Sequence, residues 1–115
     1  MTSIRAIYVV HATWCPHCHP TTVEPMEKVA RGLGIPFFSY DIDIPEQAEK
    51  ADRMVRRFGD RSKDYLIPQV FVKTREGRVR HVFTGYSESV DSTKRGLNNL
   101  INSPLFAKAN RSANR

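Results

Sequence analysis

The sequence predicts an α/β domain in which a four-stranded mixed sheet carries helices on both faces. Short runs rich in β-branched and aromatic residues alternate with segments of helical apolar spacing, in the order β-α-β-α-β-β-α. Two strands that are joined through a helix pair in parallel, with a right-handed crossover. The last two strands are separated only by a short turn that ends in glycine, so we expect them to form an antiparallel hairpin.

The first two predicted elements are a buried strand over residues 4–10 and a helix that follows Cys15 and is capped by Gly34. The helix has one apolar face, made of Val23, Met26, Val29, Ala30 and Leu33. Pro16 suits the first helical position. Pro20 and Pro25 lack the backbone donor that a helix interior needs, so we expect them to bend the helix into two pieces.

A second strand is predicted over residues 35–42, and Pro45 opens a second helix that runs to Phe58 and stops at Gly59. The hairpin strands follow at residues 69–73 and 78–83. These boundaries rest on proline and glycine, which restrict or free the backbone at the ends of elements.

The last predicted helix is capped by Ser87 or Ser89, whose hydroxyl can accept a backbone hydrogen bond. Its apolar face is made of Val90, Leu97, Leu100 and Ile101. Beyond it the chain is polar, so we expect one domain over residues 1–103 and a frayed tail over residues 104–115.

Composition narrows the function classes. The 115 residues carry a net charge of +6, and no apolar run reaches the roughly 18 residues that a membrane span requires. We therefore expect no membrane partner, a cytoplasmic location and a monomer. The basic residues between Arg53 and Lys63 interleave with apolar ones, which indicates a solvated helix face. That face favours an acidic protein partner over nucleic acid.

Cys15 and Cys18 are the two cysteines of the chain, and their C-x-x-C spacing indicates a redox pair or half of a metal site. Residues i and i+3 lie on the same side of a first helical turn, so the two thiols could close a disulfide. The helix N-terminus favours the thiolate of Cys15, and His17 would add to this effect. Cys15 would then attack a substrate disulfide, Cys18 would resolve the mixed disulfide, and Trp14 would shield the pair.

The stretch from His11 to Cys18 resembles the active site of the thioredoxin superfamily. Its Ala-x-Trp-Cys-x-x-Cys frame is similar to that of thioredoxins, and the Pro16-His17 dipeptide is similar to that of bacterial disulfide oxidases. The segment 67–72 before the hairpin is similar to glutaredoxins as well. The resemblance covers residues 4–101, and it implies a thioredoxin-like fold and a thiol–disulfide oxidoreductase.

The resemblance also implies roles for residues outside the cysteine motif. Pro68 would be a cis-proline that faces the redox pair, and the backbone of Ile67 would pair with an extended substrate strand. Gly85 matches the family's glycine after the last strand. No dissociable cofactor is implied. Electrons would come from a reductase or a low-molecular-weight thiol, and the substrates would be protein disulfides.

Several alternatives stay open at this stage. The family often places a buried acid six residues before the first cysteine, where this chain has Val9, so water, Glu24 and His11 remain candidates for accepting the proton of Cys18. Disulfide reduction is the favoured direction, and oxidation or isomerisation by an oxidising couple is the alternative. The histidines near the cysteines also allow a zinc or copper site, and a non-enzymatic adaptor is a third reading.

Overall fold

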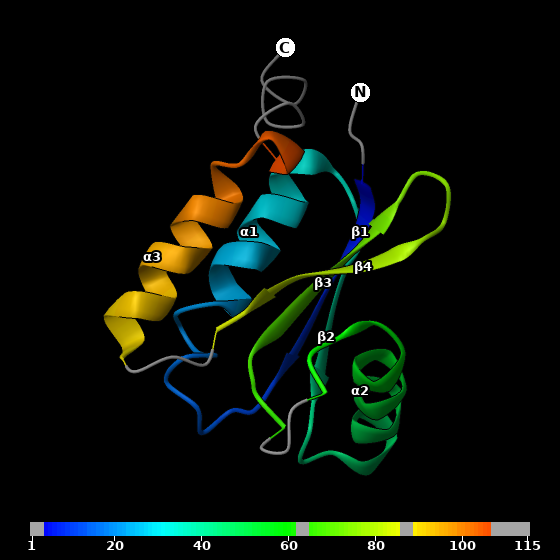
Figure 1. Cartoon of the computed structure of the whole chain (residues 1–115), viewed down its shortest axis with the longest axis vertical. Coiled ribbons are helices and arrows are strands. Elements are labelled where there is room, and N and C mark those ends of the chain that lie inside the picture. The colour runs from blue at the N-terminus through cyan, green and yellow to red at the C-terminus, as the bar shows by residue number, and fades with distance from the viewer. Residues whose placement is uncertain (1–3, 62–64, 86–88, 107–115) are drawn as a thin grey trace.

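The computed structural model describes residues 4–61, 65–85 and 89–106. Its helices and strands occur in the predicted order (Figure 1). They are β1 (Ile4–His11), α1 (Val23–Leu33), β2 (Phe37–Asp41), α2 (Pro45–Phe58), β3 (Gln69–Thr74), β4 (Val79–Thr84) and α3 (Val90–Ile101). The predicted α/β class is therefore confirmed.

The four strands form one mixed sheet in the order β2-β1-β3-β4. β1 pairs in parallel with β2 and antiparallel with β3, and β3 pairs antiparallel with β4, as the predicted hairpin requires. In these registers His11 lies opposite Asp41, and Val10 lies opposite Gln69. The C-terminal ends of β1 and β2 and the N-terminal end of β3 therefore lie side by side at one end of the strands.

Helices cover both faces of the sheet, as predicted: α1 and α3 lie on one side and α2 on the other (Figure 1). The α1–α3 core consists of Ile4, Ile7, Val9, Val23, Met26, Ala30, Val70, Val72, Leu97 and Phe106. The α2 core consists of Val10, Ala12, Cys15, Cys18, Ala51, Val55, Ile67 and Phe71. Val9 and Val10 are both fully buried on opposite faces, and each contributes about 1.5–3 kcal/mol of burial energy.

The helix that was predicted to open at Cys15 begins at Val23 instead. A turn closed on the carbonyl of Cys15 surrounds the cysteines, and a second turn closed on the carbonyl of Cys18 spans Pro20, which has no N–H to give a regular helix there. Pro20 thus separates the two pieces that the sequence suggests. Pro25 does not bend α1, because it lies in the first turn, where no backbone donor is required. Gly34 caps the helix with φ 69°.

α2 has the predicted bounds, with Pro45 in its first turn. Its basic side chains face solvent: those of Arg53 and Arg56 are 69% and 77% exposed and form loose ion pairs with Glu49 and Asp52. Such exposed pairs stabilise a helix little. Within the described ranges, no helix has both the length and the apolar character to cross a membrane.

α3 begins at Val90, and Ser89 caps it: its hydroxyl oxygen accepts a hydrogen bond from the backbone N–H of Ser92 at 3.1 Å. The other cap candidate, Ser87, lies outside the described residues.

The packed core extends past residue 103, where the sequence places the end of the domain. Residues 104–106 form a short helical turn, and Phe106 at its end is fully buried in the α1–α3 core. The predicted boundary is wrong by at least three residues because a stub this short shows no apolar period. Residues 107–115 of the predicted tail lie outside the described residues.

Phe106 gives a direct test of this boundary. Phe106→Ala is expected to lower the free energy of unfolding by about 3–5 kcal/mol, because it opens a cavity in the core. Urea denaturation measures the change. Asn99→Ala on the exposed face of α3 is the control, with an expected change within about 0.5 kcal/mol. Equal effects of the two substitutions would contradict the placement of Phe106 in the core.

Candidate functional site

The two cysteines share a single helical turn just beyond the end of β1. The backbone N–H groups of Cys18 and His19 both donate to the carbonyl of Cys15 at 3.0 Å. This turn brings the side chains of Cys15 and Cys18 to within 3.4 Å of each other, and both are free thiols. Any effect of a helix N-terminus on Cys15 therefore comes from one turn, not from a long helix as the sequence suggests.

Both cysteines belong to the α2 core, where Cys15 is 6% and Cys18 0% exposed. Burial strongly raises the pKa of the Cys18 thiol; a hydrogen bond with the backbone of Ala12 opposes this, while the neighbouring Cys15 and the charge of Asp41 raise the pKa further. Cys18 is therefore a neutral thiol near pH 7, and any reaction through it requires a group that takes its proton.

His17 lies between the cysteines and is tied to α3. Its Nδ1 is 2.7 Å from the hydroxyl of Thr93, which is 2% exposed. The Thr93 hydroxyl also donates to the carbonyl of Gly85, and the N–H of Gly85 donates to the carbonyl of Pro68 at 2.8 Å. A continuous set of hydrogen bonds thus joins the cysteine turn to the segment before β3.

That segment contains a cis peptide bond between Ile67 and Pro68, as the family resemblance implies. Ile67 is 7% exposed and lies in the α2 core with the cysteines. Gly85 packs against the proline: a Cβ there would lie 2.8 Å from Cγ of Pro68 and 3.0 Å from a ring carbon of Phe83. A side chain at position 85 would therefore collide with Pro68, so glycine is required here for packing.

Trp14 and Pro16 complete the predicted site residues. The Trp14 side chain is 66% exposed, and its indole N–H donates to the Asp43 carboxylate at 2.8 Å, which holds the ring beside the cysteine turn. The carbonyl of Pro16 accepts a hydrogen bond from the Thr21 hydroxyl at 2.8 Å. Trp14, just before the turn, and Pro16, within it, are thus each held by a hydrogen bond that involves a side chain.

Three titratable side chains form a chain from the surface to the end of β1. The carboxylate of Glu24 lies 2.8 Å from Nδ1 of His19, and Nε2 of His19 lies 2.8 Å from Nδ1 of His11. Burial and then the nearby His19 lower the pKa of His11. Burial acts to raise the pKa of Glu24, but hydrogen bonds with His19 and with the backbone, together with the charges of His19 and His11, bring this pKa below its ordinary value. Two of the proposed proton acceptors, Glu24 and His11, are therefore connected by hydrogen bonds through His19.

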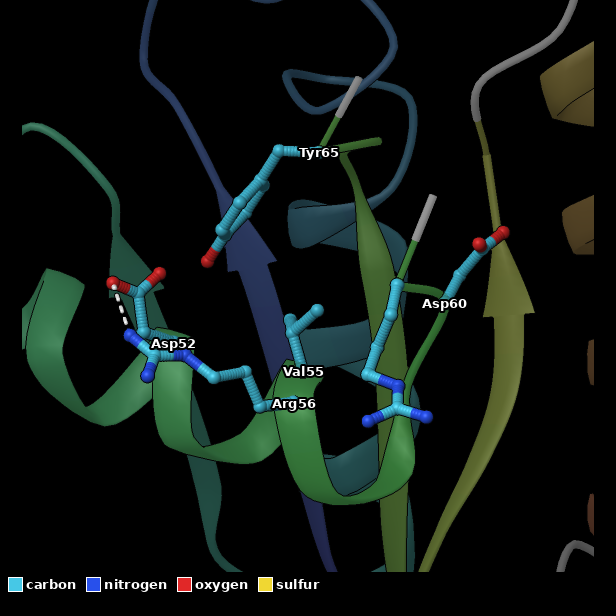
Figure 2. A pocket seen from close by; sticks show the side chains of 6 residues that line it. Asp52, Val55, Arg56, Asp60 and Tyr65 are labelled. Carbon is cyan, nitrogen blue, oxygen red and sulfur yellow. Dashed lines mark ion pairs between the residues drawn. The ribbon is translucent and has the colours of Figure 1, made fainter. Parts of the chain in front are cut away.

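A cavity of about 270 Å³ opens next to the α2 core, between α2 and the segment that leads to Ile67 (Figure 2). It is lined by Asp52, Val55, Arg56, Asp60, Arg61 and Tyr65. The Tyr65 hydroxyl points toward Asp52 (Figure 2), and burial, then Asp52, raises the pKa of this phenol. The lining therefore carries charged groups of both signs.

Sequence reasoning missed Asp41 and Thr93. Asp41 is 8% exposed, and its charge acts on both Cys18 and His11. The neighbouring ends of two parallel strands could have indicated it, since His11 and Asp41 close β1 and β2. Thr93 is 76 positions from His17, and nothing local in the sequence marks it.

The clustered histidines do not assemble a metal site in the described part of the chain, where no three Cys, His, Asp or Glu side chains converge as metal ligands. The chain was also compared with protein families, curated proteins and solved structures. No family, curated protein or solved structure matches it.

Lowering the pH from about 7 to about 5 is expected to decrease the free energy of unfolding. Unfolded His11 takes up a proton near its ordinary pKa of 6.5, whereas folded His11, with its lowered pKa, does so only at lower pH. The unfolded state therefore binds more protons and gains stability as the pH falls. His81 is half-buried, and burial lowers its pKa as well, so it adds a decrease of the same sign.

His11→Asn is expected to remove the His11 part of this pH dependence, while His81→Asn should remove the other part. Urea denaturation across the pH range measures both. A ¹H–¹³C NMR titration follows His11 directly, and a His11 ring that titrates at or above 6.5 would contradict the geometry described.

Proposed function

We propose that this chain is a dithiol–disulfide oxidoreductase of the thioredoxin/glutaredoxin type, which works as a cytoplasmic, monomeric disulfide reductase. The observation that carries the proposal is the approach of Cys15 and Cys18 to 3.4 Å within one backbone turn. Two thiols at this separation can form a disulfide with little movement of the backbone. The mixed sheet and the shared core of Ile67 with the cysteines support the same assignment.

The reaction divides between the two cysteines according to their burial. The Cys15 thiolate attacks one sulfur of a substrate disulfide; a Cys15–substrate disulfide forms, and the other substrate sulfur leaves as a thiolate. Cys18 then loses its proton and attacks Cys15, which forms the Cys15–Cys18 disulfide and releases the second substrate sulfur. Two electrons pass from the cysteine pair to the substrate, whose two thiolates take up protons.

The buried Cys18 thiol depends on a base for the second step. Its pKa is raised by burial, so the solvent deprotonates it slowly at neutral pH. Asp41 is the charged group that acts on it from β2, and His11 closes the adjacent strand. From His11, the linked His19 and Glu24 lead to the surface, which gives the proton a path to water.

The substrate is proposed to be an extended segment of a protein that carries a disulfide. The backbone of Ile67, held by the cis peptide, would pair with this segment as an added strand. The exposed Trp14 ring, next to Cys15 in the sequence, offers it an apolar contact. A reductase or a low-molecular-weight thiol would return the two electrons, and no dissociable cofactor takes part.

The experiment that tests this function is reduction of insulin with dithiothreitol as the terminal reductant. Cys15→Ser is expected to lower turnover to the uncatalysed rate because the attacking sulfur is lost. Cys18→Ser is expected to accumulate a mixed disulfide with an oxidised peptide, visible as a mass increase, because nothing resolves it. The Cys15→Ser/Cys18→Ser double variant is the control and should trap no peptide.

Full insulin-reducing activity of Cys15→Ser would contradict the proposed function. Elemental analysis of protein purified without chelator examines the metal-binding alternative. One tightly held equivalent of zinc or copper that is lost in Cys18→Ser would favour a metal site over a redox pair.

A further inference from the structure

The contact between His17 and Thr93 has consequences for the chemistry of the cysteine turn. The Thr93 hydroxyl lies in the first turns of α3, 2% exposed, with His17 Nδ1 at 2.7 Å. It also contacts the carbonyl of Gly85, and it lies 3.4 Å from the carbonyl of Ser89. The Thr93 hydroxyl therefore contacts both His17, which lies between the two cysteines, and two backbone carbonyl groups.

The direction of these hydrogen bonds follows from a count of protons. A hydroxyl has one hydrogen to donate and two lone pairs to accept with. The carbonyls of Gly85 and Ser89 can only accept, so the Thr93 hydrogen goes to a carbonyl. If His17 Nδ1 lacked a proton, its lone pair would face the hydroxyl lone pairs and repel them. His17 must therefore donate, and its Nδ1 carries a proton.

We infer that Thr93 is a positioning residue that holds His17, the residue between the two cysteines, as the Nδ1–H tautomer. The inference rests on the proposed function, in which Cys15 and Cys18 cycle between dithiol and disulfide. Protonation of Nε2 makes His17 a cation without breaking the contact with Thr93. A fixed cation between the cysteines stabilises the thiolate and thus the reduced form.

The same threonine also couples the cysteine turn to the proposed substrate groove. The Gly85 carbonyl receives the Thr93 hydrogen bond, while the Gly85 N–H donates to the carbonyl of Pro68 at 2.8 Å. His17 is thus connected to Pro68 by consecutive hydrogen bonds through Thr93 and Gly85. The tautomer of His17 thus depends on Thr93 of α3 and on Gly85, which follows β4, and both are distant in sequence from the cysteines.

Nitrogen NMR of the unaltered protein tests the tautomer without any substitution. Long-range ¹H–¹⁵N correlation spectra separate protonated from unprotonated ring nitrogens of a neutral histidine. We expect the protonated signal at Nδ1 of His17 and the unprotonated signal at Nε2, at a pH where the ring is neutral. The reverse assignment, with the proton on Nε2, would overturn the inference whatever the redox activity of the protein.

Substitutions test the consequence for redox chemistry. Thr93→Val keeps the shape and removes the hydroxyl, so the equilibrium with glutathione is expected to shift about threefold to tenfold toward the oxidised protein. Thr93→Ser, which retains the hydroxyl, should behave as the unaltered protein does. Ser92→Ala is a matched control in the same turn, because it removes an α3 hydroxyl that does not contact His17.

A double-mutant cycle separates positioning from a general loss of structure. In a His17→Ala background, Thr93→Val is expected to leave the glutathione equilibrium unchanged. An undiminished shift in that background, or no shift for folded Thr93→Val alone, would overturn the inference. If neither the unaltered protein nor any of the variants forms the Cys15–Cys18 disulfide, the proposed function is contradicted, and the inference about Thr93 is not what has failed. If Thr93→Val does not fold, the NMR assignment of the unaltered protein decides.

Discussion

β1 is paired along both of its edges and covered on both of its faces, and this double burial positions everything that follows it. Val9 lies in the α1–α3 core and Val10 in the α2 core, both fully buried. A shift of the strand register by one residue would turn every side chain of β1 to the opposite face of the sheet, so Val9 would point toward α2 and Val10 toward α1 and α3. The cysteine turn follows closely after His11, so its place at the sheet edge is set by the packing of β1.

The direction of the neighbouring strands decides which residues join that turn. β2 runs parallel to β1, so Asp41 arrives beside His11, while β3 runs antiparallel, so the segment of Pro68 begins at the same edge. α3 then brings Thr93 against His17. Segments that are far apart in sequence thus bring Asp41, the histidines and the segment of Pro68 to the same end of the sheet as the buried thiol of Cys18.

Local patterns predict much of this structure. The bounds of α2 follow from Pro45 at its start and glycine after its end, and the cysteine pair follows from its spacing alone. The start of α1 could not be predicted in this way, because apolar spacing cannot show that the chain around the cysteines and Pro20 forms separate turns. Thr93 and Phe106 escape prediction for a related reason: their importance lies in contacts with residues far away, which no local period encodes.

The redox couple of the unaltered protein can be measured by equilibration against defined mixtures of reduced and oxidised glutathione, with the disulfide fraction read by thiol alkylation. We predict one two-electron transition of the Cys15–Cys18 pair, at a potential above the thioredoxin value of about −270 mV and below the strongly oxidising value of about −120 mV. A transition at or above the upper value would contradict a reductase and indicate an oxidant or isomerase. The absence of any two-electron transition would contradict the redox pair itself.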